Sequence, residues 1–253
     1  MSTLTLAALV FAAFAAGIVD SIAGGGGVIT VPVLLSAGLD PRVMLATNKG
    51  QAIFGSTSAL IAFARQGEVD RSRAPYSFVA AMIGALGGAA LVLAIDPALL
   101  RPIVLVLLLI AAATAFIRKP TTPTRWAIVD RAPSLAAVVV AMVIGAYDGF
   151  FGPGTGTFLL LAYAIAFGDT LVRASGNAKV ANMASNLASF ALFAASGNIR
   201  WEIALPMGLA QVAGAQLGSR LAIRRGAGVV RAVAVTVSLC LAARVGWQMW
   251  SAH

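Results

Sequence analysis

The chain has 253 residues, of which 60% are hydrophobic and 11% charged, and its formal net charge is +9 at pH 7. Soluble domains carry about 25% charged residues, so this composition excludes a water-soluble globular protein and indicates a chain embedded in a lipid bilayer. The basic residues gather in short gaps between apolar runs, which is a pattern of membrane topology and argues against nucleic acid as a partner.

A helix needs about 20 mostly apolar residues to cross the hydrocarbon core of a membrane. The sequence predicts eight such helices and two shorter ones, so the expected fold class is an all-α polytopic membrane protein. In chain order, the full-length runs are 4–23, 43–64, 75–95, 98–117, 134–151, 174–196, 203–222 and 228–250, and the short runs are 28–39 and 157–168. With one cysteine and one histidine, Cys240 and His253, we expect no metal site and no cofactor.

Two glycine-rich stretches interrupt the apolar pattern, AGGGGV at 23–28 and FGPGTGT at 151–157. Glycine destabilises the interior of a helix and proline lacks a backbone donor, so both stretches are predicted to be non-helical. Non-helical backbone at membrane depth survives only where protein or a water-filled cavity satisfies its polar groups. Both breaks should therefore face the inside of the protein.

The two breaks belong to an internal repeat with an offset of about 128 residues, which aligns Asp20 with Asp148 and Gly24 with Gly152. Each half contains five predicted elements in the same order: a helix, a short helix after the break, a polar-striped helix and two plain helices. An odd number of elements in each half predicts opposite orientations in the membrane. The expected organisation is one repeat at 1–118, a cytoplasmic linker at 119–133 and a second repeat at 134–253.

Arginine and lysine residues cluster in three gaps, at 65–73, 118–131 and 220–231. The positive-inside rule places all three gaps in the cytoplasm. Both termini are then expected outside. This holds whether each broken pair crosses the membrane or folds back as a re-entrant hairpin, and the sequence leaves those two alternatives open.

Four ionisable residues lie within or at the edge of apolar runs: Asp20, Lys49, Asp148 and Lys179. An isolated Asp or Lys at the centre of a membrane helix costs about 2.5 to 3.5 kcal/mol on insertion scales. We therefore expect these four side chains to pair with one another, to face a cavity, or both. The alternative is that each aspartate only neutralises a lysine or caps a broken helix end.

Polar residues recur at helical spacing around both lysines, as Asn48, Gln51, Gly55 and Ser58 in the first half and as Ser175, Lys179, Asn182, Asn186 and Ser189 in the second. Such stripes can be plain interhelical hydrogen bonding, in which each bond averages about 0.6 kcal/mol. The more specific hypothesis joins them to the breaks. The short helices starting near Val28 and Thr157 point free N–H groups and positive dipole ends inward, which favours a small, multiply oxygenated anion.

The sequence thus favours a secondary transporter, with an anion channel as one alternative and an intramembrane aspartyl hydrolase using Asp20 and Asp148 as another. The expected partners are a small anionic substrate and the lipid bilayer, and a homo-oligomer is left open. The residues expected to bind the anion are Gly24, Gly25, Gly26, Gly27, Thr47, Asn48, Lys49, Gln51, Gly152, Gly154, Thr155, Lys179, Asn182 and Asn186; those expected to bind a coupling ion or to pair with the lysines are Asp20 and Asp148.

The stretches DSIAGGGGVITVPVLLSAGLDP, ATNKGQ, YDGFFGPGTGTF and AKVANMASN resemble the sulfite exporter TauE/SafE family. This resemblance implies a multi-pass carrier of the inner membrane that moves small sulfur-containing anions such as sulfite, thiosulfate or organosulfonates. It carries the family's glycine-rich and polar motifs onto 24–27, 47–49, 152–156 and 179–182. The second half departs from the glycine run, with Pro153 and Thr155 where the first half has Gly25 and Gly27.

Overall fold

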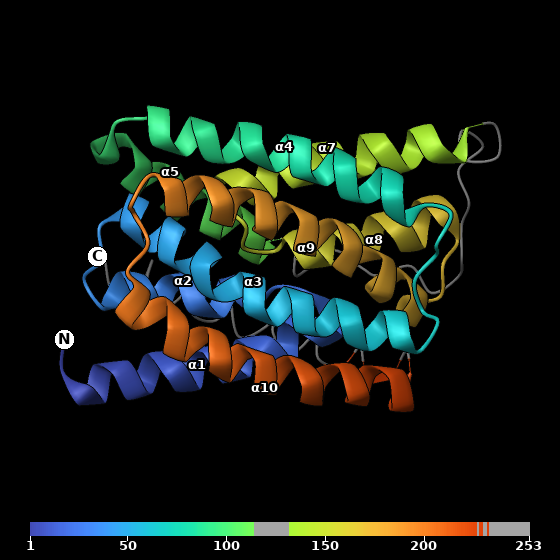
Figure 1. Cartoon of the computed structure of the whole chain (residues 1–253), viewed down its shortest axis with the longest axis horizontal. Helices are drawn as coiled ribbons and strands as arrows, with labels where there is room; N and C mark the ends of the chain where they lie inside the picture. The colour runs from blue at the N-terminus through green and yellow to red at the C-terminus, as the bar shows by residue number, and fades with distance from the viewer. Residues whose placement is uncertain (114–131, 227, 230–231, 233–253) are drawn as a thin grey trace.

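The computed structural model describes residues 1–113 and 132–226, together with 228, 229 and 232. Within this part the chain is helical and contains no strand, which confirms the all-α class (Figure 1). The helices are α1 (Thr3–Ala23), α2 (Gly26–Ser36), α3 (Pro41–Arg65), α4 (Ala74–Ala94), α5 (Pro97–Ala113), α7 (Pro133–Phe150), α8 (Thr155–Phe167), α9 (Leu171–Ala195) and α10 (Trp201–Arg225).

These limits lie within a few residues of the predicted runs, and side-chain caps mark several of the helix starts. Asp40 caps α3 by accepting a hydrogen bond from the backbone N–H of Arg42, and Thr170 caps α9 by accepting one from Arg173. The last part of run 98–117, nearly all of run 228–250 and nearly all of linker 119–133 lie outside the described residues. Pro133, assigned to the linker from the sequence, is the first residue of α7.

Each broken pair folds back as a hairpin. Met1 and Thr5 at the start of α1 line the same surface pocket as Gly38 after α2, so α2 returns to the end at which α1 begins. Pro133 at the start of α7 likewise shares a pocket with Asp169, which follows α8. The first hairpin opens at the left end of the molecule in Figure 1, where the N-terminus lies, and the second opens at the right end.

The two halves interlock through close helix pairs, α1 with α10 and α4 with α7. Glycines make these contacts: Gly84 and Gly88 of α4 lie against the carbonyls of Met142 and Ala146, and Gly149 of α7 lies against that of Ala85. A Cβ at any of these three glycines would overlap the facing backbone. Small residues spaced four apart let membrane helices approach in this way.

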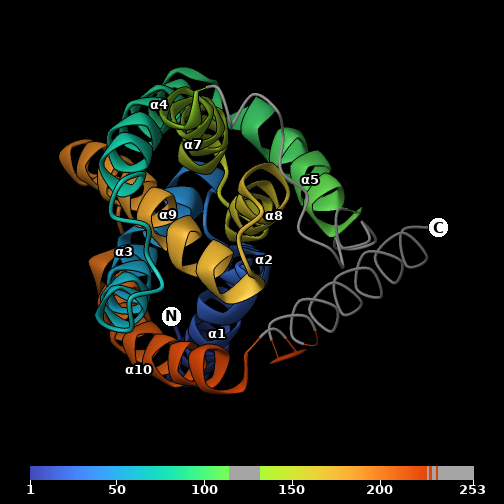
Figure 2. The same cartoon turned by 90° about the vertical axis from the view of Figure 1, so that its right-hand side faces the viewer.

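Three helices of the described part, α1, α4 and α7, are long and apolar enough to cross a membrane by length and composition. Two other long helices, α3 and α9, bury their polar stripes inside the protein. Figure 2 shows α9 in the middle of the bundle, next to α3. Their residues face protein, so their composition is less apolar. Eight full spans and inverted repeats therefore remain predictions.

At the right end of the molecule in Figure 1, Arg73 joins the α3–α4 connection to the α8–α9 connection. Its guanidinium donates to Asp169 Oδ1 at 2.8 Å and, through Nε, to Asp70 Oδ2 at 2.9 Å. Burial opposes the ionisation of Asp70, but hydrogen bonds from Ser72 and the charge of Arg73 outweigh it and lower the pKa of Asp70 from 3.8 to about 2.

The lowered pKa predicts how Asp70 contributes to stability. Because the folded pKa is below the unfolded one, the contribution is complete above pH 3.8 and is lost as the pH falls towards about 2. Asp70→Asn should therefore unfold at a lower temperature than the wild type at neutral pH, and the difference should shrink as the pH falls from 3.8 to about 2 and vanish below it. Thermal unfolding of both proteins in detergent checks this; a difference that persists unchanged at pH 2 would contradict it.

Candidate functional site

All four intramembrane charges pair, and each pair joins one half of the chain to the other. Lys49 Nζ of α3 lies 2.9 Å from Asp148 Oδ1 of α7, and Lys179 Nζ of α9 lies 3.2 Å from Asp20 Oδ2 of α1. Lys49 and Lys179 occupy matching places, each eight residues after the first residue of its helix. The four side chains together carry no net charge.

The Lys49–Asp148 pair is fully buried, with side chains 3% and 2% exposed. Lys49 Nζ also donates to Asn186 Oδ1 at 3.0 Å, and the Ser185 hydroxyl donates to Asp148 Oδ2. These bonds matter because taking two charges out of water costs several kcal/mol per ion, which attraction alone offsets only with good geometry. The polar stripe of α9 thus supports an ion pair formed by α3 and α7.

The Lys179–Asp20 pair lies at the first break. Lys179 Nζ donates to the backbone carbonyl of Asp20 as well as to its carboxylate. The other carboxylate oxygen of Asp20 accepts from the backbone N–H of Gly26, the first residue of α2, at 3.2 Å. An anion is favourable at a helix N-terminus, and at α2 the carboxylate of Asp20 occupies that position.

Both breaks are shorter than predicted. The first consists of Gly24 and Gly25 only, because α1 continues through Ala23 and α2 begins at Gly26; the second consists of residues 151–154. Glycine is tolerated in the first turn of a helix, where the N–H groups have no intrahelical partner in any case. Gly25 and Gly154, with φ of 95° and 87°, adopt the left-handed backbone that precedes each short helix.

Each break lies against the first turn of the other half's short helix, Gly24 against α8 and Pro153 against Gly27 of α2. A Cβ on Gly24 would overlap the backbone of Gly156, and the Thr157 hydroxyl donates to the Ala23 carbonyl at 3.1 Å. The first break is therefore joined to the start of α8 in the other half of the chain. Only glycine at this contact allows the two backbones to come so close.

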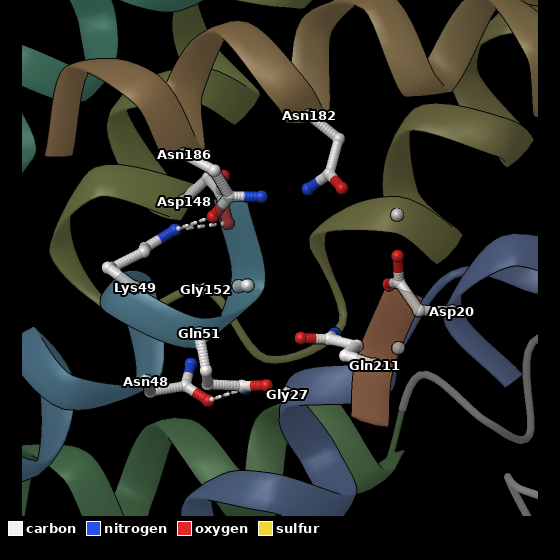
Figure 3. Close-up of a pocket in the computed structure, with 13 residues that line it drawn as sticks. Asp20, Gly27, Asn48, Lys49, Gln51, Asp148, Gly152, Asn182, Asn186 and Gln211 are labelled. Atoms are coloured by element: carbon white, nitrogen blue, oxygen red, sulfur yellow. Dashed lines mark hydrogen bonds and ion pairs between the residues drawn. The ribbon is translucent and has the colours of Figure 1, made fainter. Parts of the chain in front are cut away.

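A cavity of about 30 Å³ lies between the two ion pairs and the breaks (Figure 3). Such a volume holds one or two water molecules. Figure 3 shows Asn182 and Gln211 pointing into the space between Asp148 and Asp20. The lining residues are Asp20, Gly25, Gly27, Asn48, Lys49, Gln51, Ala52, Asp148, Gly152, Gly156, Asn182, Asn186 and Gln211.

Ten of the sixteen residues expected at the site line this cavity, and the others have different places. Thr47 accepts from the backbone N–H of Arg200 at 3.1 Å, and Thr155 donates to the carbonyl of Gly152 at 2.7 Å. Lys179 is turned towards the backbone of Asp20. Gly24 packs on the first turn of α8, the backbone N–H of Gly26 donates to Asp20, and Gly154 precedes α8.

Gln211 of α10 is the main residue that the sequence did not indicate. It lies in the apolar run 203–222. The polar carboxamides of Gln211 and Gln216 within this run are the sequence feature that could have indicated a site residue. Gln211 Oε1 and Gln51 Oε1 are buried and have no hydrogen-bond partner among the described residues. The cavity thus offers unused polar atoms from α3 and α10, and an amide group of Asn182 without a partner in the part of the chain that is described.

Together, apolar outer helices, two broken hairpins and a buried polar cavity define a membrane protein that handles a small polar solute. The chain matches the model of the sulfite exporter TauE/SafE family over residues 9–245, and it belongs to that family. It is a membrane transporter.

Similar proteins carry matching names. The probable membrane transporter protein ORF9 of Sinorhizobium sp is 41% identical over 95% of this chain and 92% of that protein. The probable membrane transporter protein YfcA of Escherichia coli strain K12 is 37% identical over 97% and 91%. A probable membrane transporter protein of Haemophilus influenzae is 36% identical over 96% of both. No solved structure matches the chain.

Proposed function

We propose that this protein is a secondary transporter that moves small anions, in particular sulfur oxyanions or organosulfonates, through the central cavity. The observation that carries the proposal is the pair of lysine–aspartate bridges that join the two halves beside the broken helices. A substrate oxyanion competes with each aspartate for the same lysine and the same N–H groups. Site occupancy is thereby linked to the contacts that hold the halves together.

The cavity supports an anion chemically. Lys49 supplies a charge, Asn182 and Gln211 supply carboxamides, and Gly27 and Gly156 bring the first turns of α2 and α8 to its wall. A four-atom oxyanion is larger than about 30 Å³ of free space allows, so binding requires the ion pairs to shift. That requirement favours a carrier, which changes shape around its substrate, over an open channel.

The proposed orientation places the right end of Figure 1 in the cytoplasm. The α3–α4 connection and the end of α10 lie there. That connection and the last residue of α3 contain Arg65, Arg71 and Arg73, as the positive-inside rule requires. The two hairpins that open at opposite ends support inverted repeats in an inner membrane with the N-terminus outside. An inside-negative potential then favours export of an anion by about 2.3 kcal/mol per charge at 100 mV.

The aspartyl hydrolase alternative is less well supported. An aspartyl dyad needs two carboxylates that share one proton, whereas Asp20 and Asp148 are each engaged by a lysine. An anion channel is separated from a carrier by counterflow in proteoliposomes, because a pore shows no stimulation by substrate on the opposite side. Counterflow of sulfite or a sulfonate is the outcome expected here.

Anion binding is tested most simply by thermal unfolding of the purified protein with sulfite, thiosulfate, a sulfonate, carboxylates or phosphate. Stabilisation should grow with ligand concentration and reach about 2.7 kcal/mol at 100-fold excess over the dissociation constant. Asn182→Ala should weaken sulfite binding about tenfold, since a hydrogen bond to a charged group contributes about 1.5 to 3 kcal/mol. Its unliganded stability should hardly change, because the Asn182 side chain has no partner among the described residues.

Asn198→Ala is the matched control, because Asn198 lies in the α9–α10 connection and its side chain bonds only to Ser196 in the described part of the chain. It should leave the sulfite response intact. If none of these anions stabilises the protein, the proposal is wrong.

A further inference from the structure

A second pocket, of about 330 Å³, lies where α3 and α10 end, at the proposed cytoplasmic face. Figure 2 views the molecule from this end, and α3 and α10 lie side by side there. Three arginines line the pocket, Arg65 from α3 and Arg220 and Arg224 from α10, and no acidic residue of the described chain does. The pocket is therefore strongly positive.

These three arginines differ from the ion-paired arginines of the described chain. Arg73, Arg173 and Arg200 form ion pairs with carboxylates. Within the described residues, Arg65, Arg220 and Arg224 form none. A planar guanidinium binds an oxyanion through two parallel hydrogen bonds, and three of them around one pocket suit a group with several oxygens.

The pocket is separated from the central cavity by one polar layer. Gln216 lines the pocket, and its Nε2 donates to Ser58 Oγ of α3 at 2.9 Å. Three residues before Ser58, Gly55 lies against the side chain of Gln211, which lines the central cavity. A seam of small and polar residues between α3 and α10 thus leads from the arginines to the lysine–aspartate pairs.

Unpaired polar atoms mark the same two helices. Among the described residues, five buried side-chain polar atoms lack a hydrogen-bond partner, and three of them belong to α3 or α10: Gln51 Oε1, Gln211 Oε1 and Ser219 Oγ. A buried polar group without a partner is unfavourable. Parting of α3 from α10 would let water or a solute reach these atoms.

We infer that Arg65, Arg220 and Arg224 form a recruitment site for the oxyanion substrate, and that the α3–α10 seam, closed by the Gln216–Ser58 hydrogen bond, is its path to the central cavity. The recruitment site stands on the pocket itself, whereas the path rests on the proposed transport function. A phosphate headgroup of an anionic lipid offers the same chemistry. The seam favours the substrate, because it connects the pocket to the site within the protein.

The test is the double variant Arg220→Gln/Arg224→Gln in proteoliposomes of neutral lipid, assayed by sulfite counterflow. A positive pocket raises the local anion concentration and the association rate by about 10- to 1000-fold at low salt. We expect KM to rise about tenfold with kcat unchanged, and the difference to shrink at about 1 M salt, where the screening length is about 3 Å.

Arg71→Gln/Arg225→Gln is the control. It removes two charges from the same end, and neither side chain lines the pocket, so KM should stay at the wild-type value. An equal rise of KM in the control would assign the effect to overall charge and overturn the recruitment site.

Two further outcomes distinguish the possibilities. If KM changes only when anionic lipid is present, the pocket binds a headgroup and the inference is wrong. If the wild type shows counterflow and the double variant keeps its KM in neutral lipid, the recruitment site fails while the transport function stands. If the wild type shows no counterflow, the proposed transport function is wrong. The recruitment site is then tested by direct sulfite binding, which should be lost in the Arg220/Arg224 variant and kept in the control.

Discussion

Lys49→Ala is expected to destabilise the protein by about 3 to 5 kcal/mol, because it leaves Asp148 buried without its counter-ion. The carboxylate of Asp148 would keep the Ser185 hydroxyl but lose the only cation that contacts it in the described structure. Chemical unfolding of the purified protein in detergent measures the loss. A change below about 1 kcal/mol would show that the carboxylate is hydrated or protonated once the lysine is gone.

The second residue of the pair gives the decisive comparison. Lys49→Ala/Asp148→Ala removes both charges, so it should be more stable than Lys49→Ala alone, since no uncompensated charge remains. A double-mutant cycle isolates this coupling. Sulfite binding should not recover in the double variant, because the substrate still lacks its cation. Recovery of both stability and binding would mean that the pair has a structural role only.

The other pair provides an internal reference. Asp20 is 15% exposed, and Lys179 also donates to the backbone carbonyl of Asp20. Without the Asp20 carboxylate, Lys179 Nζ still donates to the backbone carbonyl of residue 20, and water reaches this site more easily than it reaches the Lys49–Asp148 pair. Asp20→Ala should cost less stability than Asp148→Ala.

Gly88→Ala is expected to disrupt the contact between α4 and α7. A Cβ at this position would overlap the carbonyl oxygen of Ala146, so the helices must separate along their shared face. Overpacking of this kind costs about 1 to 3 kcal/mol or more. Loss of close packing is particularly costly in lipid, where association depends on van der Waals contact rather than on the hydrophobic effect.

The preceding residue is a control on the same helix. A Cβ on Gly87 meets no atom within 4 Å, and alanine is a better helix former than glycine by about 1 kcal/mol. Gly87→Ala should therefore raise the unfolding temperature, whereas Gly88→Ala lowers it. Thermal unfolding of both variants under one condition checks the opposite signs. Equal effects at both positions would show that propensity, and not helix contact, controls stability here.

Much of the architecture can be predicted from the sequence, because membrane helices are recognisable by their length and apolar composition. The apolar runs 43–64 and 174–196 predict α3 and α9 but start two or three residues late, because Asp40 and Thr170 cap these helices before the apolar pattern begins. The sequence also indicates where the breaks and the four charges lie, because non-helical backbone and isolated charges are unfavourable in hydrocarbon unless the protein satisfies them. The extent of each break was overestimated, since glycines in a helix's first turn look the same as glycines outside it.

The sequence by itself determined the class of protein, the helical elements, the two breaks and the presence of charges that need partners. Only the tertiary structure decided that Lys49 binds Asp148 and Lys179 binds Asp20, that Gln211 reaches the cavity, and that each short helix folds back. The physical reason is that periodicity fixes which residues share a face of one helix, whereas the partner of that face depends on how closely backbones approach. In this protein, glycines far apart in the chain set that approach.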